Sequence, residues 1–496
     1  MVVKVDTQKE IIFGSSDPNI SRVISKKEKD GELRKLAPRI YTTNLIDSPA
    51  NIVRRNLIEI LAYRYPNALI SHRSAKEMRP TSTGDFFLTN STARRVTDLP
   101  GIILNFVKGP KATAHDIPFM GMHISGEHRY MLENMQLSRK SGDESRVLPI
   151  SVIENKLEQL LLTGGEERLN QYRDELREVA NELGMADEFS KINNIISALL
   201  STHDARVLST DSAKARASGN PFDVNRVGLF EILFDTIKDR YFVIRNNRNT
   251  DEDSFRLFSF FESYFSNYIE GTEFDIEEAK EIVDSGIPMP RRDEDSHDIL
   301  GTFKILSNRT EMRRVPTSPE ELFAILSHRH TILLEGRPHM NPGVFKMRNN
   351  RAGQTEFVDY QLVKGTLSQG FKYYSALTDP FARAIFMMFM ISEVHPFNDG
   401  NGRIARVMMN AEFVRADQSR IIVPTVFRED YILALRKLTR HKDPMAYINV
   451  MTKLHQFSDN LYGTDFTELK NYLAACNAYE EPSQAKLQII DRSIRH

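Results

Sequence analysis

The chain has 496 residues, and its 66 lysines and arginines nearly balance its 67 aspartates and glutamates, which gives a formal net charge of -1. This balance excludes a general attraction to nucleic acid or membranes, so any basic surface must be local. A single cysteine, Cys476, excludes an internal disulfide framework and fits a reducing compartment. We find neither a signal-peptide pattern nor an apolar run of the ~18 residues that a membrane span needs. The sequence therefore predicts a soluble cytoplasmic protein without a membrane partner, and its length predicts about three domains.

Residues 1–60 have the pattern of a small DNA-binding domain. Helical spacing runs from Ile20 to Asp30, Gly31 ends the helix, and strand-like segments follow on both sides of Pro38. This order of helix, glycine and β-ribbon is typical of a winged helix. Between residues 21 and 40, seven basic residues stand against three acidic ones, which fits phosphate contacts and equally fits a solvated face. The candidate DNA contacts are Arg22, Lys26, Lys27 and Lys29.

Residues 61–145 are expected to form a small α/β domain, in which we find no catalytic cluster. Short strands are predicted at residues 68–71, 84–89 and 102–107. Residues 146–208 then carry apolar side chains at helical spacing, which predicts a helical connector. The following segment, residues 209–222, is rich in Ser, Ala, Gly and Pro and predicts an exposed linker at a domain boundary.

The most informative stretch is His395-Pro-Phe-Asn-Asp-Gly-Asn-Gly-Arg-Ile-Ala-Arg406. The residues before it, 381–394, are apolar almost all round, which predicts a helix buried on every side that ends at His395. Pro396 and the glycines interrupt this helix, and apolar spacing resumes in a second helix near Arg403. The bare backbone at Gly400 and Gly402 would let N–H groups approach an anion at the start of that second helix.

The side chains of this stretch fit one chemistry. Cations at a helix start are disfavoured by the dipole, so Arg403 and Arg406 predict a bound polyanion. Asp399 beside a phosphate-binding loop is a natural ligand for one Mg²⁺. Neutral His395 supplies a general base with a pKa near working pH. Each piece alone is more often part of a simple turn, and the coincidence of all of them within twelve residues favours a catalytic site.

These twelve residues resemble, at every fixed position, the His-Pro-Phe-x-Asp/Glu-Gly-Asn-Gly-Arg-x-x-Arg signature of the Fic (filamentation induced by cAMP) family. The resemblance implies a compact helical fold that transfers AMP from ATP, with Mg²⁺ as cofactor, to a Ser, Thr or Tyr hydroxyl of a protein target or of the chain itself. It implies that His395 is the base, Phe397 a buried loop anchor and Asp399 the metal ligand. The phosphate-binding residues that it implies are Gly400, Asn401, Gly402 and Arg403, with Arg406 on the γ-phosphate.

A second motif, Ser266-Asn-Tyr-Ile-Glu-Gly271, ends an aromatic-rich helical segment at residues 255–271. Alone, Glu270 would be an ordinary surface carboxylate. The spacing resembles the Ser/Thr-x-x-x-Glu-Gly/Asn motif of Fic proteins with an N-terminal inhibitory helix. That resemblance implies that Glu270, in a motif that begins at Ser266, pairs with Arg406 and denies the γ-phosphate its partner. The enzyme would then rest in an autoinhibited state.

Between the two motifs, residues 342–358 predict a β-hairpin with its turn at residues 349–353. In the Fic family a flap at this place pairs with the backbone of the target, a case of β-strand addition. The resemblance implies that Phe357 and Val358 lie on the arm that meets the target. Lys346 replaces the arginine that is usual in the family, and its role stays open.

The segments at residues 31–43 and 65–75 (GELRKLAPRIYTT and YPNALISHRSA) resemble AbiE-type antitoxins and regulators, in which a winged helix precedes a small α/β domain. The fold class is therefore expected to be mainly α, with a helical Fic core over residues 220–460 that includes the flap, an α/β N-terminal region with a winged helix, and a C-terminal tail at residues 461–496. The function that these resemblances imply is a protein adenylyltransferase autoinhibited by Glu270. Two alternatives stay open, a de-AMPylase with the same site and a DNA-binding regulator whose Fic domain senses nucleotide. A homo-oligomer also stays open.

Overall fold

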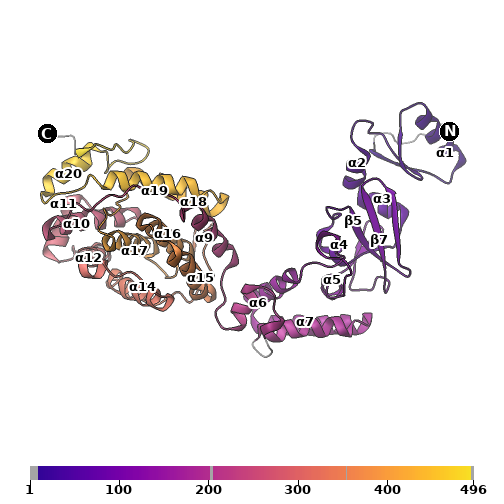
Figure 1. Cartoon of the computed structure of the whole chain (residues 1–496), viewed down its shortest axis with the longest axis horizontal. Helices are drawn as coiled ribbons and strands as arrows, with labels where there is room; N and C mark the ends of the chain where they lie inside the picture. Colours follow the sequence, from indigo (N-terminus) through magenta and orange to yellow (C-terminus); the bar gives the residue numbers. More distant parts are fainter. Residues whose placement is uncertain (1–8, 201–204, 354, 493–496) are drawn as a thin grey trace. The chain divides into compact units, whose positions relative to one another are not determined.

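The computed structural model describes residues 9–200, 205–353 and 355–492. The chain divides into two compact units, residues 1–218 and residues 219–496 (Figure 1). Sheets and helices make up the first unit, whereas helices dominate the second. The predicted fold class, mainly α with an α/β N-terminal region, is therefore confirmed. Within the described ranges, no helix is both long and apolar enough to cross a bilayer.

The first unit begins with a three-stranded antiparallel sheet and one helix. Strands β1 (Ile11–Phe13), β2 (Arg34–Ala37) and β3 (Ile40–Thr42) lie in the order β1-β3-β2, and helix α1 (Pro18–Lys29) joins β1 to β2. The helix starts where the Asp17 side chain accepts a hydrogen bond from the Asn19 N–H at 2.8 Å. Between β2 and β3, Arg39 takes the left-handed φ of 62° after Pro38, the arrangement of a type II turn. The helix and the ribbon are thus present, and the winged helix stays a prediction.

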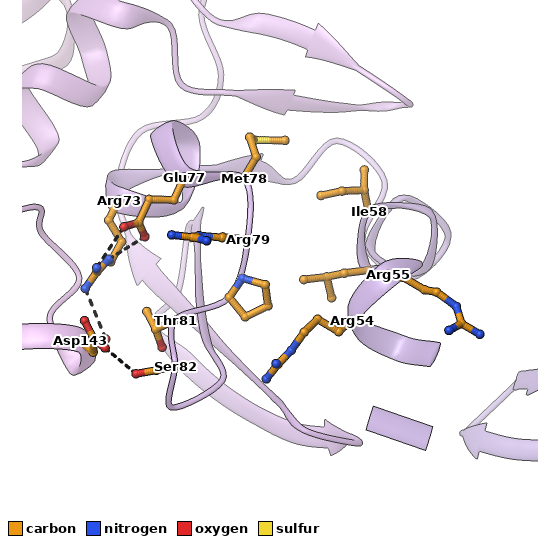
Figure 2. A pocket seen from close by; sticks show the side chains of 12 residues that line it. Arg54, Arg55, Ile58, Arg73, Glu77, Met78, Arg79, Thr81, Ser82 and Asp143 are labelled. Carbon is orange, nitrogen blue, oxygen red and sulfur yellow. Dashed lines mark hydrogen bonds and ion pairs between the residues drawn. The ribbon is translucent and has the colours of Figure 1, made fainter. Parts of the chain in front are cut away.

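A six-stranded mixed sheet follows, in the order β6-β7-β5-β4-β9-β8. Its strands are β4 (Leu69–Ile70), β5 (Asp85–Asn90), β6 (Arg94–Leu99), β7 (Ile102–Lys108), β8 (Ile117–Phe119) and β9 (Met122–Ile124), and its helices are α2 (Pro49–Arg55), α3 (Leu57–Arg64), α4 (His72–Glu77) and α5 (Glu127–Glu133). Strands occur at all three predicted places. Ile40 of the small sheet and Leu88 of the large one belong to the same buried cluster, so residues 1–60 and 61–145 share one core. A cleft opens between α2 and the loop after α4 (Figure 2).

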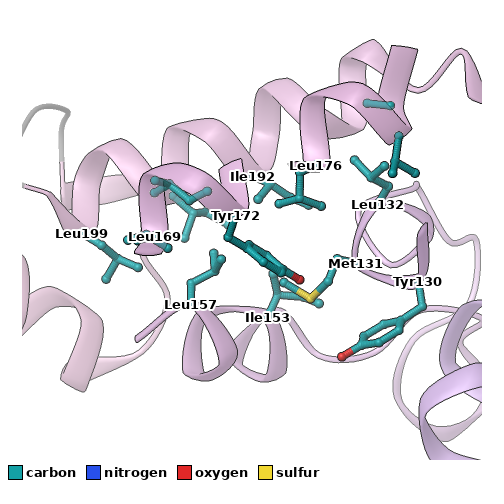
Figure 3. Close-up of a cluster of buried hydrophobic side chains, with 14 of the residues drawn as sticks. Tyr130, Met131, Leu132, Ile153, Leu157, Leu169, Tyr172, Leu176, Ile192 and Leu199 are labelled. Atoms are coloured by element: carbon teal, nitrogen blue, oxygen red, sulfur yellow. The ribbon is translucent and has the colours of Figure 1, made fainter. Parts of the chain in front are cut away.

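The predicted helical connector belongs to the first unit. It forms α6 (Ile150–Leu183), broken at Gly165 where φ is 68°, and α7 (Ala186–Leu199). Figure 3 shows Leu157 and Tyr172 of α6 packed with Ile192 of α7 and Met131 of α5. The connector therefore shares a core with the end of the α/β region, because its apolar stripe needs a partner to be buried.

The predicted exposed linker at residues 209–222 is partly wrong. It contains helix α8 (Asp211–Ala217), whose Ser212 side chain is buried. The Glu154 carboxylate accepts from the N–H groups of Ser209 and Thr210 at 2.7 and 2.9 Å, and Ser212 Oγ donates to Glu158 at 2.8 Å. Two glutamates of α6 thus bind the segment. Composition alone could not predict these contacts, because they depend on how α6 packs. The division between the units falls at residues 218 and 219.

The second unit is a helical bundle around α16 (Pro380–Val394). Its other helices are α9 (Val224–Ile237), α10 (Glu252–Ile269), α11 (Ile276–Ser285), α12 (Asp293–Leu306), α13 (Arg309–Met312), α14 (Pro319–Leu333), α15 (Val363–Ala376), α17 (Asn401–Arg415), α18 (Arg428–His441), α19 (Pro444–Ser458) and α20 (Phe466–Ala475). Every side chain from residue 384 to 391 has 0% exposure. The prediction of a central helix buried on every side is therefore confirmed.

A short hairpin is present within residues 342–358, but its predicted turn is displaced. Strands β10 (Arg351–Ala352) and β11 (Thr355–Glu356) pair so that Ala352 faces Thr355. The turn therefore includes Gly353, at the C-terminal end of the predicted residues 349–353, and not the residues before Arg351. The displacement follows from Asn350, whose side chain donates to the Phe397 carbonyl at 2.9 Å and so belongs to the base of the hairpin.

Residues 461–496 were expected to form a tail, and this expectation is wrong for the described part. Helix α20 and the residues after it pack on α10. Phe466 stacks on Phe261 with 5.8 Å between ring centroids, and Tyr479 stacks on Phe265 at 5.4 Å. Burial of the apolar area of these aromatic rings keeps the C-terminal segment on the bundle.

Candidate active site

The loop between α16 and α17 carries the sequence motif and is held at both ends. Helix α16 ends at His395, which takes a left-handed φ of 52°. The Asn401 side chain accepts from the Phe397 N–H at 2.8 Å and donates to the Phe397 carbonyl at 2.8 Å. The Asn401 amide thus substitutes for backbone pairing across the turn. Its side chain is buried and committed to the loop, so only its backbone N–H remains for a phosphate.

His395 is positioned as a base. Its Nδ1 lies 3.1 Å from the Ser392 carbonyl oxygen. Because a carbonyl only accepts, Nδ1 carries the hydrogen and Nε2 keeps a free lone pair. Burial lowers the pKa of His395 to about 4, since the charged imidazolium loses solvation. The imidazole is therefore neutral at neutral pH, and its pKa lies below the value near working pH that the sequence predicted, because the site buries the ring.

A second histidine, His330 of α14, contacts the loop through a hydrogen bond and a ring stack. Its Nδ1 accepts from the Gly343 N–H at 2.9 Å, and its Nε2 bonds the Asp399 carbonyl at 2.9 Å. Its ring stacks on the fully buried Phe397, with centroids 3.7 Å apart. Burial lowers the pKa of His330 to about 4, so its two different hydrogen bonds fix one neutral tautomer.

The start of α17 forms the anion-binding side of the site. Gly400 caps the helix with a left-handed φ of 70°, and the first N–H groups of a helix have no partner within it. A Cβ at Gly402 would lie 2.1 Å from the Glu270 carboxylate. Only glycine therefore lets a carboxylate approach so closely. The helix start already holds a negative group, and that group comes from the second sequence motif.

Arg406 and Glu270 form an ion pair at this helix start. Glu270 caps the C-terminus of α10, and its Oε1 lies 2.7 Å from Arg406 Nη2. Arg406 also donates to the Ser266 hydroxyl and carbonyl at 3.0 and 2.9 Å. Burial alone would raise the pKa of Glu270, but the Arg406 guanidinium lowers it overall. Both groups therefore stay charged, and the guanidinium is engaged within the chain.

Arg403 is held by a carboxylate that the sequence analysis missed. Its Nη1 lies 2.7 Å from Asp298 of α12 and 3.3 Å from the Asn267 side-chain oxygen. Asp298 also accepts from Arg337 at 2.8 Å. Asp298 is 2% exposed, so one buried carboxylate orients two guanidiniums. Its position on α12, far from the motif in sequence, left no local signal that could have identified it.

Asp399 fits the donor expected for one Mg²⁺. Its Oδ1 accepts from the Gly400 N–H at 2.7 Å, its Oδ2 lies 3.7 Å from Arg403, and its side chain is 40% exposed. Among the described residues, no group of three His, Cys, Asp or Glu side chains gathers as a metal site. A single accessible carboxylate suits Mg²⁺, which takes its other ligands from phosphates and water.

The hairpin places an aromatic ring directly on the base. Phe357 stacks on His395 with 3.6 Å between centroids and an angle of 3°. Val358 was expected to meet a target, but its side chain is fully buried, so it faces the interior of the fold. Lys346, whose role the sequence left open, bonds to the base of the hairpin and to α16. Its Nζ donates to Asn350 at 2.7 Å and to the Val394 carbonyl at 3.4 Å, which ties the hairpin base to α16.

Of the candidate DNA contacts, three share an exposed face of α1. Arg22, Lys26 and Lys29 line one shallow pocket there, as their spacing on a helix predicts. Lys27 differs, because its ammonium pairs with Glu32.

Comparison with known proteins agrees with this geometry. Residues 318–412 match the model of the Fic/DOC family. The chain therefore carries a Fic/DOC family domain, and this domain contains the whole loop that bears His395 and Arg406. The fold and the site thus define a protein that contains a Fic domain.

The relatives that share this domain include named enzymes. A protein adenylyltransferase fic-1 of Caenorhabditis elegans is 30% identical over 115 residues, which is 23% of this chain and 22% of the relative. A protein adenylyltransferase Fic of Nematostella vectensis is 24% identical over 214 residues, or 40% of this chain and 47% of the relative. Among solved structures, Fic-1 from C. elegans covers 66% of this chain and 92% of its own, with 17% identity and a TM-score of 0.36. The chain thus spans less than half the length of these curated relatives.

Proposed function

We propose that the chain is a protein adenylyltransferase, which transfers AMP from Mg-ATP to a Ser, Thr or Tyr hydroxyl of a protein. The observation that carries the proposal is the free Nε2 of a neutral His395, beside a glycine-bounded helix start with two arginines. A base next to a polyphosphate site has the parts that nucleotidyl transfer needs. The relatives named protein adenylyltransferases support the same reaction.

In the proposed reaction, His395 Nε2 removes the proton from the target hydroxyl. The hydroxyl oxygen then bonds to the α-phosphorus of ATP, and the bond from that phosphorus to pyrophosphate breaks. Arg403 and the N–H groups at the start of α17 stabilise the charge that develops on the phosphates. Bound at Asp399, Mg²⁺ would neutralise further phosphate charge. Asp298 and Asn267 hold Arg403 in place for this role.

The hairpin offers a place for the target. In the described part of the chain, β10 and β11 pair only with each other, so each strand has an unpaired edge that can take another strand. Arg226 donates to the Glu356 carbonyl, and Arg440 donates to Thr355 Oγ1 at 2.9 Å. These two arginines hold the hairpin still. A target strand added to such an edge would bring its hydroxyl near His395.

We infer further that the resting enzyme is autoinhibited by Glu270. A carboxylate that contacts Gly402 and Arg406 occupies the groups that a γ-phosphate would use. Since both are anions, they compete for the same guanidinium. Bound ATP would then lack its γ-phosphate partner and the alignment that in-line attack requires.

The test is transfer of label from α-labelled ATP to protein. We expect little transfer by the unchanged chain and a rise of about 5- to 150-fold in Glu270→Gly, the range of a coupling of 1–3 kcal/mol. Glu273→Gly, which removes an exposed carboxylate three residues later, is the matched control and should change nothing. Label from γ-labelled ATP instead would assign phosphoryl transfer. Equal transfer by the unchanged chain and Glu270→Gly would exclude autoinhibition.

The reverse reaction would have a different outcome. If Glu270 instead aligns water to remove AMP, a previously AMP-modified protein should lose its label only when Glu270 is intact. That result, together with no transfer in Glu270→Gly, would replace the proposal with a de-AMPylase.

A second candidate function rests on the exposed basic face of α1. Arg22, Lys26 and Lys29 lie within two turns of one helix face, a pattern that suits contacts to DNA phosphates. We propose that the first unit binds duplex DNA through this face. Loss of a salt-dependent gel shift in Lys26→Gln with Lys29→Gln would support it, and an unchanged shift would exclude this face.

A further inference from the structure

The first unit contains a second basic surface, which neither motif explains. It is a cleft with two walls (Figure 2). The end of α2 and the start of α3 form one wall, and residues 77–82 form the other. Four arginines line it, and they stand against two acidic residues, Glu77 and Asp143. The four are Arg54, Arg55, Arg73 and Arg79. The cleft is therefore positively charged overall.

Among the described residues, two of the four arginines have acidic partners. Arg55 pairs with Glu10 and with Asp47, the latter at 2.7 Å. Arg73 pairs with Glu77 at 2.9 Å and donates to the carbonyls of residues 142 and 145 at 3.1 Å. Their donors are used within the fold.

Arg54 and Arg79 differ from this pair. Both side chains belong to exposed residues, and among the described residues neither has an ion pair, a hydrogen bond or a ring contact. Arg54 extends from the last turn of α2, and Arg79 comes from the opposite wall (Figure 2). Two guanidiniums on opposite walls therefore remain available to a bound anion.

The wall that carries Arg79 is braced. Met78 takes a left-handed φ of 51°, which turns the chain at the end of α4 just before Arg79. After it, the Thr81 N–H donates to the Asp85 carbonyl at 3.0 Å, and Ser82 Oγ donates to Asp143. A non-glycine residue in this conformation needs support from its surroundings. Arg79 thus projects from a fixed turn, which reduces the entropy that binding must overcome.

The other residues of the cleft indicate the kind of anion. No aromatic side chain lines it, and its only carboxylates are paired with Arg73 or bonded to Ser82. A free nucleotide would find no aromatic ring among the lining residues on which its base could stack. A duplex needs no such ring, because its bases are paired inside the helix and its phosphates face outward.

We propose that this cleft binds the phosphate backbone of a duplex nucleic acid through Arg54 and Arg79. The proposal rests on the DNA contact proposed for the first unit, and adds a site to it that lies outside α1. The shared chemistry is a phosphodiester, which DNA and RNA duplexes both present.

The test is the salt dependence of binding by the full chain, measured by fluorescence anisotropy with a short duplex DNA and, separately, a duplex RNA. The plot of log affinity against log salt has a negative slope, and each lost phosphate contact reduces the magnitude of that slope by about 0.9 for B-DNA. Arg54→Gln with Arg79→Gln should therefore lower the slope by about twice that. Arg177→Gln, which removes one charge from an exposed pair with Asp174, is the control and should leave the slope unchanged.

The outcomes separate this site from the α1 face. An unchanged slope in the double variant, with a lowered slope in Lys26→Gln and Lys29→Gln, would overturn the cleft and keep the DNA contact. Absence of any duplex binding by the unchanged chain would overturn both. A lowered slope with RNA but not with DNA would support the phosphate site and assign it to RNA.

Discussion

Two pairs of arginines, one pair in each unit, lie in opposite surroundings. In the helical unit, Arg403 and Arg406 are buried and engaged by Asp298 and Glu270. In the α/β unit, Arg54 and Arg79 are exposed and have no such partner among the described residues. Buried charges must be paired, because an unpaired one loses its solvation. The two arginines of the helical unit therefore have carboxylate partners within the fold, whereas Arg54 and Arg79 have none among the described residues.

The largest expected effect concerns the base of the helical unit. In a Glu270→Gly background, His395→Ala should lower AMP transfer by about 10²–10⁴-fold, the usual contribution of a general base. His328→Ala, an exposed histidine on α14, is the control. The measurement is the initial rate of label transfer from α-labelled ATP. A rate within a few-fold of the parent would mean that another group takes the proton.

Next in size is the cost of removing a buried charge. Asp298→Asn should lower the free energy of unfolding by roughly 3–5 kcal/mol, because two guanidiniums lose their carboxylate. Glu294→Gln is the matched control, since Glu294 contacts the same Arg337 at 3.2 Å but is 51% exposed. Its expected cost is about 0–1 kcal/mol. Chemical denaturation measures both, and equal costs would remove the contrast between buried and exposed pairing.

The pH dependence of transfer tests the burial of His395. Its pKa of about 4 lies below the ordinary 6.5, so the neutral base should persist until pH falls through about 4. Phe357→Ala uncovers the ring and should move the acid limb of kcat/KM up toward pH 6.5 in the Glu270→Gly background. Tyr360→Ala, on the same segment but not stacked on the base, should leave it unmoved. If the acid limb stays near pH 4 in Phe357→Ala, residues other than Phe357 bury His395 and lower its pKa.

The smallest expected effect is the change in stability on replacing the two exposed arginines of the cleft. Arg54→Gln with Arg79→Gln should change the free energy of unfolding by no more than about 0.5 kcal/mol, because neither side chain has an internal partner to lose. Denaturation under the conditions used for Asp298→Asn gives the number. A loss of several kcal/mol would show that these arginines stabilise the fold, and the open cleft would then need another explanation.

Local sequence predicted much of the chemistry. The apolar run before His395 predicted a buried helix, and α16 has that character because no face of it is polar. The glycines of residues 400–402 predicted a helix start open to anions, since bare backbone is a property of the residues themselves. The segment at residues 255–271 likewise became α10, which ends at Glu270. These features depend on periodicity and backbone freedom, which a short window contains.

The sequence by itself thus determined the loop, its candidate base and the helices that flank it. Tertiary structure alone decided which distant groups meet there: Asp298 on Arg403, His330 under Phe397, and Phe357 on His395. It also decided that Phe466 and Tyr479 pack on α10 and that Arg54 lines a cleft without a partner among the described residues. The physical reason is that periodicity predicts which face of an element is apolar, whereas the partner of a buried charge or ring depends on how separate elements pack.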